Sequence, residues 1–417
     1  MGRKSVHIVG GGIIGLCSAW YLNQQGFEVT IIDKGDLTDG ASHGNAGMVV
    51  PSHVIPLASP GMISQGIKWM FNSKSPFYVK PRLDLSLLQW TYKFYKSCNE
   101  GHVKKAMPFL FHLNEWSKEL YQEFVAHPEF NFNFQKDGLL MLYRTAHQEE
   151  EEKELAEKAH HIGLDTQVLN NSQLKELDPH INSEVKGGVY FPGDANLHPN
   201  KFVKQLTTVL KKNGVVIQTN TEVVGLEEHR GKVHSIVLEG GQKVAVENLL
   251  VAGGAWSAQI LKKSGLKIYL QDGKGYSVTF NSLANKPKIP AILTEGKVAV
   301  SPIGDELRIG GTLELGGMST NINQNRLDGI FECLPKYYQE IDIDTEQKKK
   351  VWYGYRPCTP DGMPYIGKAD TCNNLYVATG HAMMGVSMGP ATGKLIAEII
   401  SDTKQSMDTS MFRLNRF

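Results

Sequence analysis

Paired cysteines and long apolar runs are both missing from this chain of 417 residues. Its five cysteines are an odd number and show no CxxC spacing, which argues against a disulfide framework and a zinc site, so we expect no metal. No stretch approaches the roughly 20 apolar residues that a membrane-spanning helix needs. The opening residues lead into a short strand pattern, not into the long apolar region of a signal peptide. We therefore expect a cytoplasmic protein.

Net charge is also nearly absent, because 44 basic side chains are balanced by 43 acidic ones, and the net charge is +1. This balance gives no reason to expect a nucleic-acid partner. Residues 57–98 interleave aromatic and basic side chains, a pattern that favours helices packed over a site with their lysines pointing outward. Peripheral contact with the inner face of a membrane is the alternative. The length predicts two or three lobes, and a homo-oligomer is left open.

A glycine motif is the first strong pattern that is present. An apolar run typical of a buried strand leads directly into Gly10, Gly12 and Gly15, and a helical pattern follows. Gly10 permits a tight turn, Gly12 lets the backbone approach a pyrophosphate, and Gly15 lets the helix pack on the strand. The first helical amides, at Ile13 and Ile14, would face the phosphates, where the helix dipole favours negative charge. The motif predicts a dinucleotide-binding βαβ unit.

An acidic residue ends the second expected strand of this unit. Asp33 lies about 20 residues beyond the glycines, where a carboxylate accepts hydrogen bonds from ribose hydroxyls. We assign the adjacent Lys34 to the same site. A carboxylate here would repel the 2′-phosphate of NADP, but it does not distinguish NAD from FAD.

The next segment, residues 40–49, is small and polar. It resembles the Ser-x-x-Asn-Ala-Gly segment of the FAD-dependent D-amino acid dehydrogenases, in the glycine oxidase/D-amino acid oxidase superfamily. In that family the segment runs beside the flavin diphosphate and isoalloxazine. The resemblance therefore implies cofactor contacts for Ser42, Asn45, Ala46, Gly47 and Met48. On the residues alone, a solvated glycine turn is the alternative.

Later segments resemble the same family in the same order. A buried strand ends in small residues at 252–254, a second glycine site that an NAD-dependent dehydrogenase does not need and that favours FAD. Residues 352–367 are similar to the family's Gly-x-Arg-Pro-x-Thr-Pro-Asp-Gly segment, and residues 375–390 to its closing strand, loop and helix. The resemblance implies further cofactor contacts at Val223 (through its backbone), Ala252, Gly253, Gly254, Trp256, Gly354, Gly380, His381, Gly385, Val386 and Ser387.

The resemblance also implies how FAD is attached. Relatives that tether the flavin use a Cys or His at the positions matching Gly354 or Asn45, and neither residue here is a nucleophile. We therefore expect noncovalent FAD, although Cys358 and His43 lie close by in sequence.

Three residues are candidates for the chemistry. Arg356 matches the family's carboxylate-binding arginine, and a guanidinium can hold a substrate carboxylate through two hydrogen bonds. A structural salt bridge is the alternative role. Tyr276 would add a hydroxyl to the carboxylate or fill the sheet, and His381 would lie beside the flavin edge or be a loop histidine bonded to backbone. Arg308 is a weaker candidate, because strand arginines usually point outward.

The expected reaction is oxidative deamination of a D-amino acid by hydride transfer from Cα to flavin N5, with electrons passing to a quinone or other carrier. Residues 382–384, Ala-Met-Met, stand where glycine oxidases carry an arginine, so we expect an apolar pocket wall. That wall favours a larger apolar or cyclic substrate, such as D-proline or cis-4-hydroxy-D-proline. The alternatives are a glycine- or sarcosine-type amine oxidase that uses oxygen, and a non-catalytic flavoprotein subunit.

The expected fold is α/β, with a Rossmann-like (GR2-type) FAD-binding domain and an interleaved α+β substrate domain built on a mostly antiparallel sheet. We expect the FAD-binding domain to comprise residues 1–56, 187–270 and 351–417. Residues 57–186 and 271–350 would form the substrate domain.

Overall fold

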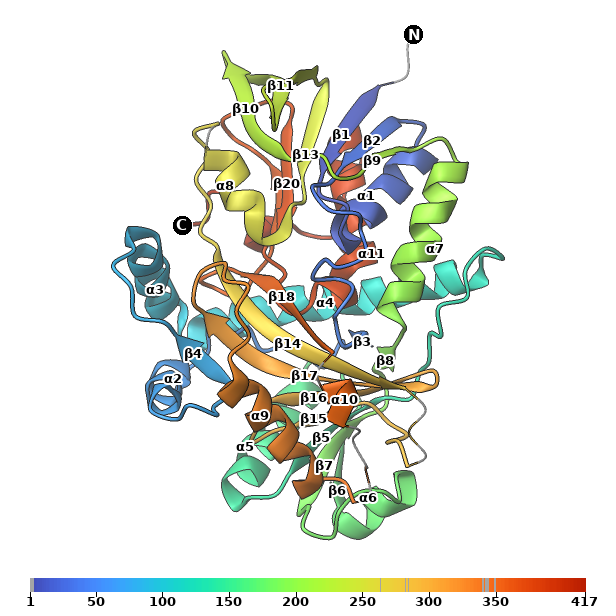
Figure 1. The fold of residues 1–417 in the computed structure, drawn as a ribbon, viewed down its shortest axis with the longest axis vertical. Helices are drawn as coiled ribbons and strands as arrows, with labels where there is room; N and C mark the ends of the chain where they lie inside the picture. The colour runs from blue at the N-terminus through green and yellow to red at the C-terminus, as the bar shows by residue number, and fades with distance from the viewer. Residues whose placement is uncertain are drawn as a thin grey trace.

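Two large sheets, one above the other in Figure 1, organise the chain. The computed structural model describes residues 4–262, 264–281, 283, 285–339, 341, 345–348 and 350–417. The upper sheet has the strand order β19-β20-β13-β1-β2-β9, and it is parallel except for β19. Its strands are β1 (Ser5–Val9), β2 (Glu28–Ile32), β9 (Val216–Gln218), β13 (Asn248–Val251), β19 (Tyr365–Lys368) and β20 (Leu375–Thr379).

Helices cover this sheet because its strands are apolar on both faces. The covering helices are α1 (Ile13–Gln24), α4 (Glu100–Ala126), α7 (Pro199–Lys212), α8 (Ser257–Lys262) and α11 (Gly385–Ser401), with the 3-10 turn η1 (Gly254–Trp256). Helix α1 is buried along most of its length, since α11 packs directly against it. A Cβ at Gly393 of α11 would lie 2.5 Å from the Cys17 backbone, so only glycine allows this approach. The contact places the first turns of both helices beneath the same sheet.

The lower sheet has nine strands in the order β18-β14-β17-β16-β15-β5-β7-β6, with β4 added beside β17. Most neighbours are antiparallel; the β15–β5 and β17–β4 pairs are parallel. Its strands are β4 (Phe77–Val79), β5 (Leu139–Tyr143), β6 (Gln167–Asn170), β7 (Gly187–Phe191), β14 (Gln271–Asn281), β15 (Ala291–Leu293), β16 (Val298–Ile303), β17 (Glu306–Leu315) and β18 (Val351–Cys358). The mostly antiparallel substrate-domain sheet is therefore confirmed.

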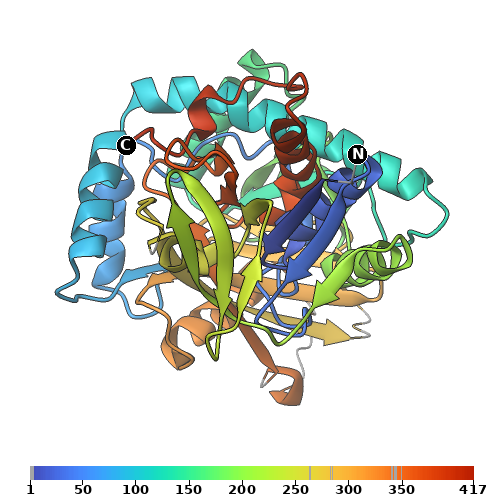
Figure 2. The same cartoon turned by 90° about the horizontal axis from the view of Figure 1, so that it is seen from above.

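Shorter elements surround these two sheets. They are the ribbon β3 (Met48–Val49) with β8 (Ala195–Asn196), the sheet of β10 (Val223–His229), β11 (Lys232–Leu238) and β12 (Lys243–Ala245), the helices α2 (Met62–Met70), α3 (Leu85–Ser97), α5 (Ala146–His161), α6 (Asn171–Leu177), α9 (Gln324–Cys333) and α10 (Thr345–Lys348), and the 3-10 turns η2 (Leu334–Lys336) and η3 (Ser410–Phe412). Helices α2 and α3 project from one side in both views (Figures 1 and 2). Among the described residues, no helix combines the length and apolar character that crossing a bilayer requires.

The expected domain boundaries at residues 187 and 351 do not coincide with the points at which the chain leaves the nine-stranded sheet. Strand β7 follows the boundary at 187 and strand β18 follows the boundary at 351, yet both pair within the nine-stranded sheet. The reason is long-range pairing: Gly275 of β14 lies opposite Gly354 of β18, and Met141 of β5 opposite Val189 of β7. The chain therefore passes between the sheets after these strands, not before them.

Candidate active site

The first turn of α1 forms one end of the site. Gly12 is the N-cap residue and brings no capping side chain, so Ser42 reaches over instead, and its Oγ accepts a hydrogen bond from the Ile13 amide at 3.0 Å. A helix N-terminus with amides that lack intrahelical partners is suited to a phosphate group. The second glycine segment lies alongside, because a Cβ at Gly10 would be 2.5 Å from the Ala252 carbonyl oxygen.

The expected ribose and adenine contacts gather at the ends of β1 and β2. The two carboxylate oxygens of Asp33 accept hydrogen bonds from the amides of Gly11, at 2.6 Å, and Gly35, at 2.7 Å. Val223 belongs to the apolar cluster at the ends of these strands. The Lys34 ammonium lies 3.6 Å from the centre of a Trp256 ring. The structure thus brings the nucleotide-binding candidates from four separate segments together.

A cavity of about 1110 Å³ lies against the nine-stranded sheet, and α2, α4 and α5 contribute to its walls. We call residues 41–48 the cofactor loop, and five of them line the cavity together with Gly354, Arg356 and residues 382–384. Asn45 connects two of these walls: its side-chain amide donates to the Met383 carbonyl at 3.0 Å, and its side-chain oxygen accepts from the Gly47 amide at 2.9 Å. Met48, Met383 and Met384 give the cavity the apolar wall expected from the sequence.

Arg308 holds the cofactor loop to the nine-stranded sheet. Its Nη1 donates to the carbonyls of His43, at 2.9 Å, and Asn45, at 2.7 Å, while Nε donates to Thr279. Ser277 adds a hydrogen bond of 3.0 Å to the Gly44 carbonyl. The expectation that Arg308 points outward is wrong, since the residue is only 4% exposed and burial lowers its pKa to about 10. Strand β17 is an interior strand of the sheet, and the backbone carbonyls of the cofactor loop are the acceptors for the guanidinium of Arg308.

Arg356 of β18 lines the cavity beside the cofactor loop. Its Nη1 donates to the Thr312 carbonyl at 2.5 Å, and its guanidinium lies over Gly275, where a Cβ would be 2.1 Å from Nη1. Within the described part of the chain, no carboxylate forms an ion pair with Arg356, so the salt-bridge alternative has no support there. The side chain lines the cavity, and burial lowers its pKa. A partly buried cation that has no anionic partner among the described residues can accept an anionic ligand.

Tyr276 lines the same cavity, but its hydroxyl is engaged elsewhere. The oxygen accepts a hydrogen bond from the Asn323 amide at 3.0 Å, and it also bonds to Glu314. The ring packs in the apolar cluster of the nine-stranded sheet, and burial raises the pKa of the hydroxyl. This arrangement supports the sheet-filling role.

His381 is also turned away from the cavity, although residues 382–384 line it. Its Nε2 lies 2.9 Å from the Thr392 hydroxyl of α11, and burial lowers its pKa to about 3. A neutral histidine bonded to α11 fixes the loop that precedes this helix. At the first turn of α11, Ser387 donates to the Asn114 side-chain oxygen at 2.6 Å and accepts from the Val50 amide at 2.9 Å. Gly380, Gly385 and Val386 belong to the same strand-loop-helix connection.

Trp352 is a site residue that the sequence did not single out. Its ring lies between the cofactor loop and β18, because a Cβ at Gly44 would be 2.0 Å from the ring and a Cβ at Gly354 would be 2.2 Å from it. The indole nitrogen donates to the Asp39 carbonyl at 3.0 Å. The matching glycines at 44 and 354 are the only sequence signal for this packing, and they lie 310 residues apart in the chain.

A family model described as FAD dependent oxidoreductase (DAO) matches residues 5–399. The chain belongs to that family. It is an FAD-dependent oxidoreductase. A D-amino acid dehydrogenase of Helicobacter pylori is 30% identical over 417 residues, covering 100% of this chain and 99% of the relative. A D-amino acid dehydrogenase of Vibrio atlanticus is 29% identical, with 99% of both chains covered.

Solved structures show the same fold. Glycine oxidase from Geobacillus kaustophilus superposes with a TM-score of 0.78 at 22% identity, covering 100% of both chains. L-proline dehydrogenase from P. horikoshii superposes with a TM-score of 0.75 at 20% identity, covering 100% of this chain and 98% of the other. The expected Rossmann-like FAD-binding fold is confirmed.

The residues of this oxidoreductase fit FAD. The first turn of α1 offers amides to a pyrophosphate, and Asp33 presents a carboxylate at the end of β2, where a ribose would lie. The cofactor loop then leads from Ser42 into the cavity, which is large enough for a ring system and a substrate.

We predict that Arg308→Met weakens FAD binding about tenfold or more, because the loop carbonyls lose the donors that hold them to β17. Flavin absorbance relative to protein absorbance after gel filtration measures the retained FAD, and titration of the apoprotein measures its affinity. Arg413→Met is the matched control, since Arg413 is exposed and far along the chain from the loop. Equal FAD affinity in the Arg308→Met and control variants would contradict the role of Arg308.

Proposed function

We propose that this FAD-dependent oxidoreductase is a D-amino acid dehydrogenase. The observation that carries the proposal is Arg356, a partly buried guanidinium that lines the same cavity as the cofactor loop and has no carboxylate partner among the described residues. Full-length similarity to D-amino acid dehydrogenases of two bacterial genera supports the same substrate class. A zwitterionic amino acid supplies the carboxylate that Arg356 lacks.

The chain's own residues have mainly a binding and orienting task. Arg356 holds the substrate carboxylate, and two parallel hydrogen bonds fix orientation as well as position. Substrate binding in this geometry directs the Cα–H bond toward the cofactor loop, and the apolar wall of Met48 and Met384 limits water near the reacting centre. FAD, when bound, supplies the acceptor for two electrons and the Cα hydrogen. The resulting imine hydrolyses in water to a 2-oxo acid and ammonium, or to an open-chain product if the substrate is cyclic.

The apolar wall also bears on the identity of the substrate. Three methionines and Ala382 line the cavity where a small zwitterion such as glycine would leave much space unfilled. We therefore favour a larger apolar or cyclic D-amino acid, including D-proline and cis-4-hydroxy-D-proline. Electrons then pass to a quinone or another carrier.

We predict that a D-amino acid, but not its L-isomer, reduces the bound flavin under anaerobic conditions, seen as loss of flavin absorbance in stopped flow. Arg356→Ala should keep FAD but lower the second-order rate of reduction by about 30-fold to several thousand-fold, as expected when one partner of a buried charge pair is removed. The reduction rate of Arg356→Lys should lie between those of the wild type and Arg356→Ala, because lysine keeps the positive charge but cannot make two parallel hydrogen bonds to a carboxylate. Arg413→Ala is the control.

Other outcomes identify the alternatives. If glycine or sarcosine reduced the flavin faster than any D-amino acid, the protein would be an amine oxidase. Oxygen consumption at the same rate as substrate oxidation would then identify oxygen as the electron acceptor. A flavin that no amine reduces would indicate a non-catalytic subunit. Wild-type rates in Arg356→Ala would show that another residue binds the carboxylate.

We propose that FAD is bound noncovalently. Asn45 and Gly354 offer no nucleophile, and burial raises the pKa of the nearby Cys358 thiol to about 12, which keeps it unreactive. We predict that precipitating the protein with acid releases the yellow colour into the supernatant. A flavin that stays with the protein pellet would contradict this mode of binding.

We further propose that the α2–α3 region touches an anionic membrane surface. One side of α3 packs inward through Leu87 and Trp90, but its other side and α2 carry exposed apolar side chains. Phe71 is 89% exposed and Leu85 is 70% exposed. The full set of exposed large apolar residues in this region is Ile67, Met70, Phe71, Leu83, Leu85, Leu88, Tyr92 and Tyr95. Figure 2 shows both helices at one edge of the molecule, which suits docking on a flat surface.

The charge of this region matches an anionic bilayer. Residues 57–98 contain six basic residues and one acidic residue, a formal charge of +5, whereas the entire chain carries +1. Basic residues beside exposed aromatic and aliphatic side chains are the combination that holds a protein at an anionic lipid interface. Met62, Gln65 and Trp69 of α2 also line the cavity, so an electron acceptor dissolved in the membrane would approach from this side.

We predict that the protein sediments with vesicles of anionic lipid at low salt, and less with zwitterionic vesicles or at high salt. Phe71→Ser combined with Leu85→Ser should reduce the bound fraction at least several-fold, because two exposed apolar anchors are lost. Val168→Ser with Val216→Ser, two exposed apolar residues elsewhere, is the control. Failure to bind anionic vesicles, with dimer formation through this face measured by light scattering, would contradict the proposal.

A further inference from the structure

Glu152 of α5 carries a buried carboxyl group that has no hydrogen-bond partner in the described part of the chain. It is 4% exposed and lines the cavity on the side of α5 and β5. Within the described residues, neither of its carboxyl oxygens accepts or donates a hydrogen bond, and Oε2 is out of reach of solvent. Buried polar groups are nearly always paired, so an unpaired carboxyl group that lines a cavity indicates a missing ligand. Burial raises the pKa of Glu152 to about 7, and the nearby charge of Lys297 opposes this effect.

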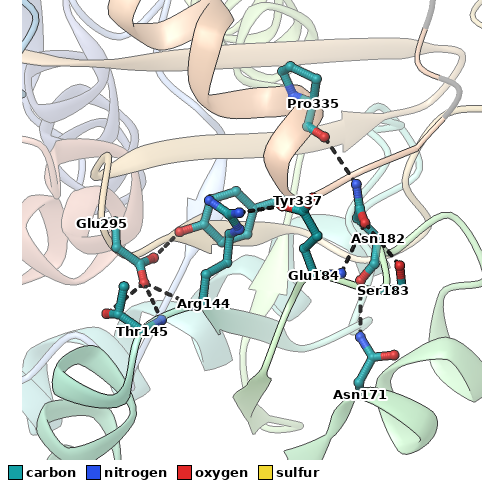
Figure 3. Close-up of polar contacts among 9 residues, drawn as sticks. All are labelled: Arg144, Thr145, Asn171, Asn182, Ser183, Glu184, Glu295, Pro335 and Tyr337. Carbon is teal, nitrogen blue, oxygen red and sulfur yellow. Dashed lines mark hydrogen bonds and ion pairs between the residues drawn. The ribbon is translucent and has the colours of Figure 1, made fainter.

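A polar network fixes the position of this wall (Figure 3). The Glu295 carboxylate accepts hydrogen bonds from the amides of Arg144, at 2.8 Å, and Thr145, at 2.9 Å, and from the hydroxyl of Tyr337. Thr145 is the N-cap of α5, and Glu295 belongs to the turn that joins β15 to β16. The network therefore ties the helix that carries Glu152 to the turn that carries Lys297.

His53 adds a second acceptor to the same part of the cavity. Ser52 donates its hydroxyl hydrogen to the buried carboxylate of Asp194, and its amide donates to the same carboxylate at 3.1 Å. The Ser52 oxygen lies 3.3 Å from Nδ1 of His53, and with its own hydrogen directed to Asp194 it accepts from that nitrogen in the tautomer that carries the ring proton on Nδ1. The Nε2 of a neutral His53 is then an acceptor. Burial, together with the charge of Lys297, lowers the pKa of His53 to about 4, so the ring is neutral.

Sheet order places these groups far from the carboxylate-binding arginine. Arg356 lies on β18, whereas Lys297 precedes β16, and Glu152 lies on the helix that packs against β5 and β7. Three to six strand spacings separate these positions, on the order of 14–29 Å between backbones. Long side chains at both ends shorten this gap, but an amino group next to Cα could not contact both Arg356 and Glu152. The acceptors therefore face the far end of a bound substrate.

We propose that Glu152 and His53 form a distal subsite that binds a hydrogen-bond donor at the end of a long substrate side chain. This inference rests on the proposed function and narrows it to D-amino acids with an apolar chain that ends in an ammonium, amide or hydroxyl group. The methylene part of such a chain would lie along Met48 and Met141, which line the cavity. The terminal donor would satisfy the acceptors that the chain leaves unpaired.

The test compares substrates of similar length. With an artificial electron acceptor, kcat/KM is measured for three substrates that end in a donor, D-lysine, D-glutamine and 5-hydroxy-D-norvaline. Each value is divided by kcat/KM for D-norleucine, which has no terminal donor. In Glu152→Leu, the ratio for the preferred donor should fall tenfold or more, because the acceptor is removed while the buried volume is kept. If the kcat/KM ratio falls by a similar factor in Glu152→Gln, the donor is an ammonium group, because an ammonium group needs the negative charge of Glu152. If the ratio stays at the wild-type value in Glu152→Gln, the donor is an amide or hydroxyl group.

Glu150→Gln is the matched control, because Glu150 is exposed on the same helix, and its substitution removes the same charge. Flavin content measured beside activity shows that each variant is folded, and Glu152→Met, which is also apolar and of similar volume, serves if Glu152→Leu does not load FAD. A ratio in the apolar Glu152 variant within twofold of wild type, or a wild-type preference for D-norleucine over all three donors, would overturn the subsite. If no D-amino acid reduces the wild-type flavin, the proposed function itself fails, which is a separate result.

Discussion

Hydrogen bonds from the nine-stranded sheet to three consecutive carbonyls of the cofactor loop are the contact on which the site depends. Arg308 and Ser277 donate to the carbonyls of His43, Gly44 and Asn45. These carbonyls belong to the loop between β2 and β3, and the donors belong to β14 and β17 of the nine-stranded sheet. The contact therefore fixes the distance between the cofactor loop and Arg356, two strands away from Arg308 in the same sheet. Without it, the cavity would have no fixed width.

Arg308 and Arg356 show how partners decide the role of a side chain. Arg308 has backbone and hydroxyl acceptors around its guanidinium, so it is structurally satisfied. Arg356 has one carbonyl acceptor and no carboxylate partner in the described part of the chain. Arg308 is buried and Arg356 is partly exposed to the cavity, and of these two arginines only Arg356 retains capacity for an anionic ligand. The same reasoning separates Glu295, whose carboxylate accepts from several donors, from Glu152, whose carboxyl group has none among the described residues.

Much of the cofactor site could be predicted from the sequence because its parts are local. Gly10, Gly12 and Gly15 act within one strand-turn-helix unit, and Asp33 ends the next strand, so spacing alone places them. The roles of Arg308 and Trp352 depend on segments more than 250 residues away, and no local pattern reveals such contacts. Tyr276 and His381 were named as candidates, but their polar atoms bond to Asn323 and Thr392, partners that sequence could not supply. The domain boundaries at 187 and 351 differ from the sheet membership for the same reason, since strand pairing is long-range.

The most direct test of Arg356 as the carboxylate-binding residue is a crystal structure of the FAD-loaded protein with a bound D-amino acid or a carboxylate inhibitor. We predict that the ligand carboxylate makes two hydrogen bonds of about 2.7–2.9 Å to the guanidinium of Arg356, with Cα facing the flavin beside the cofactor loop. A carboxylate bound instead to Lys297 or to Arg308, with Arg356 contacting only protein, would contradict it.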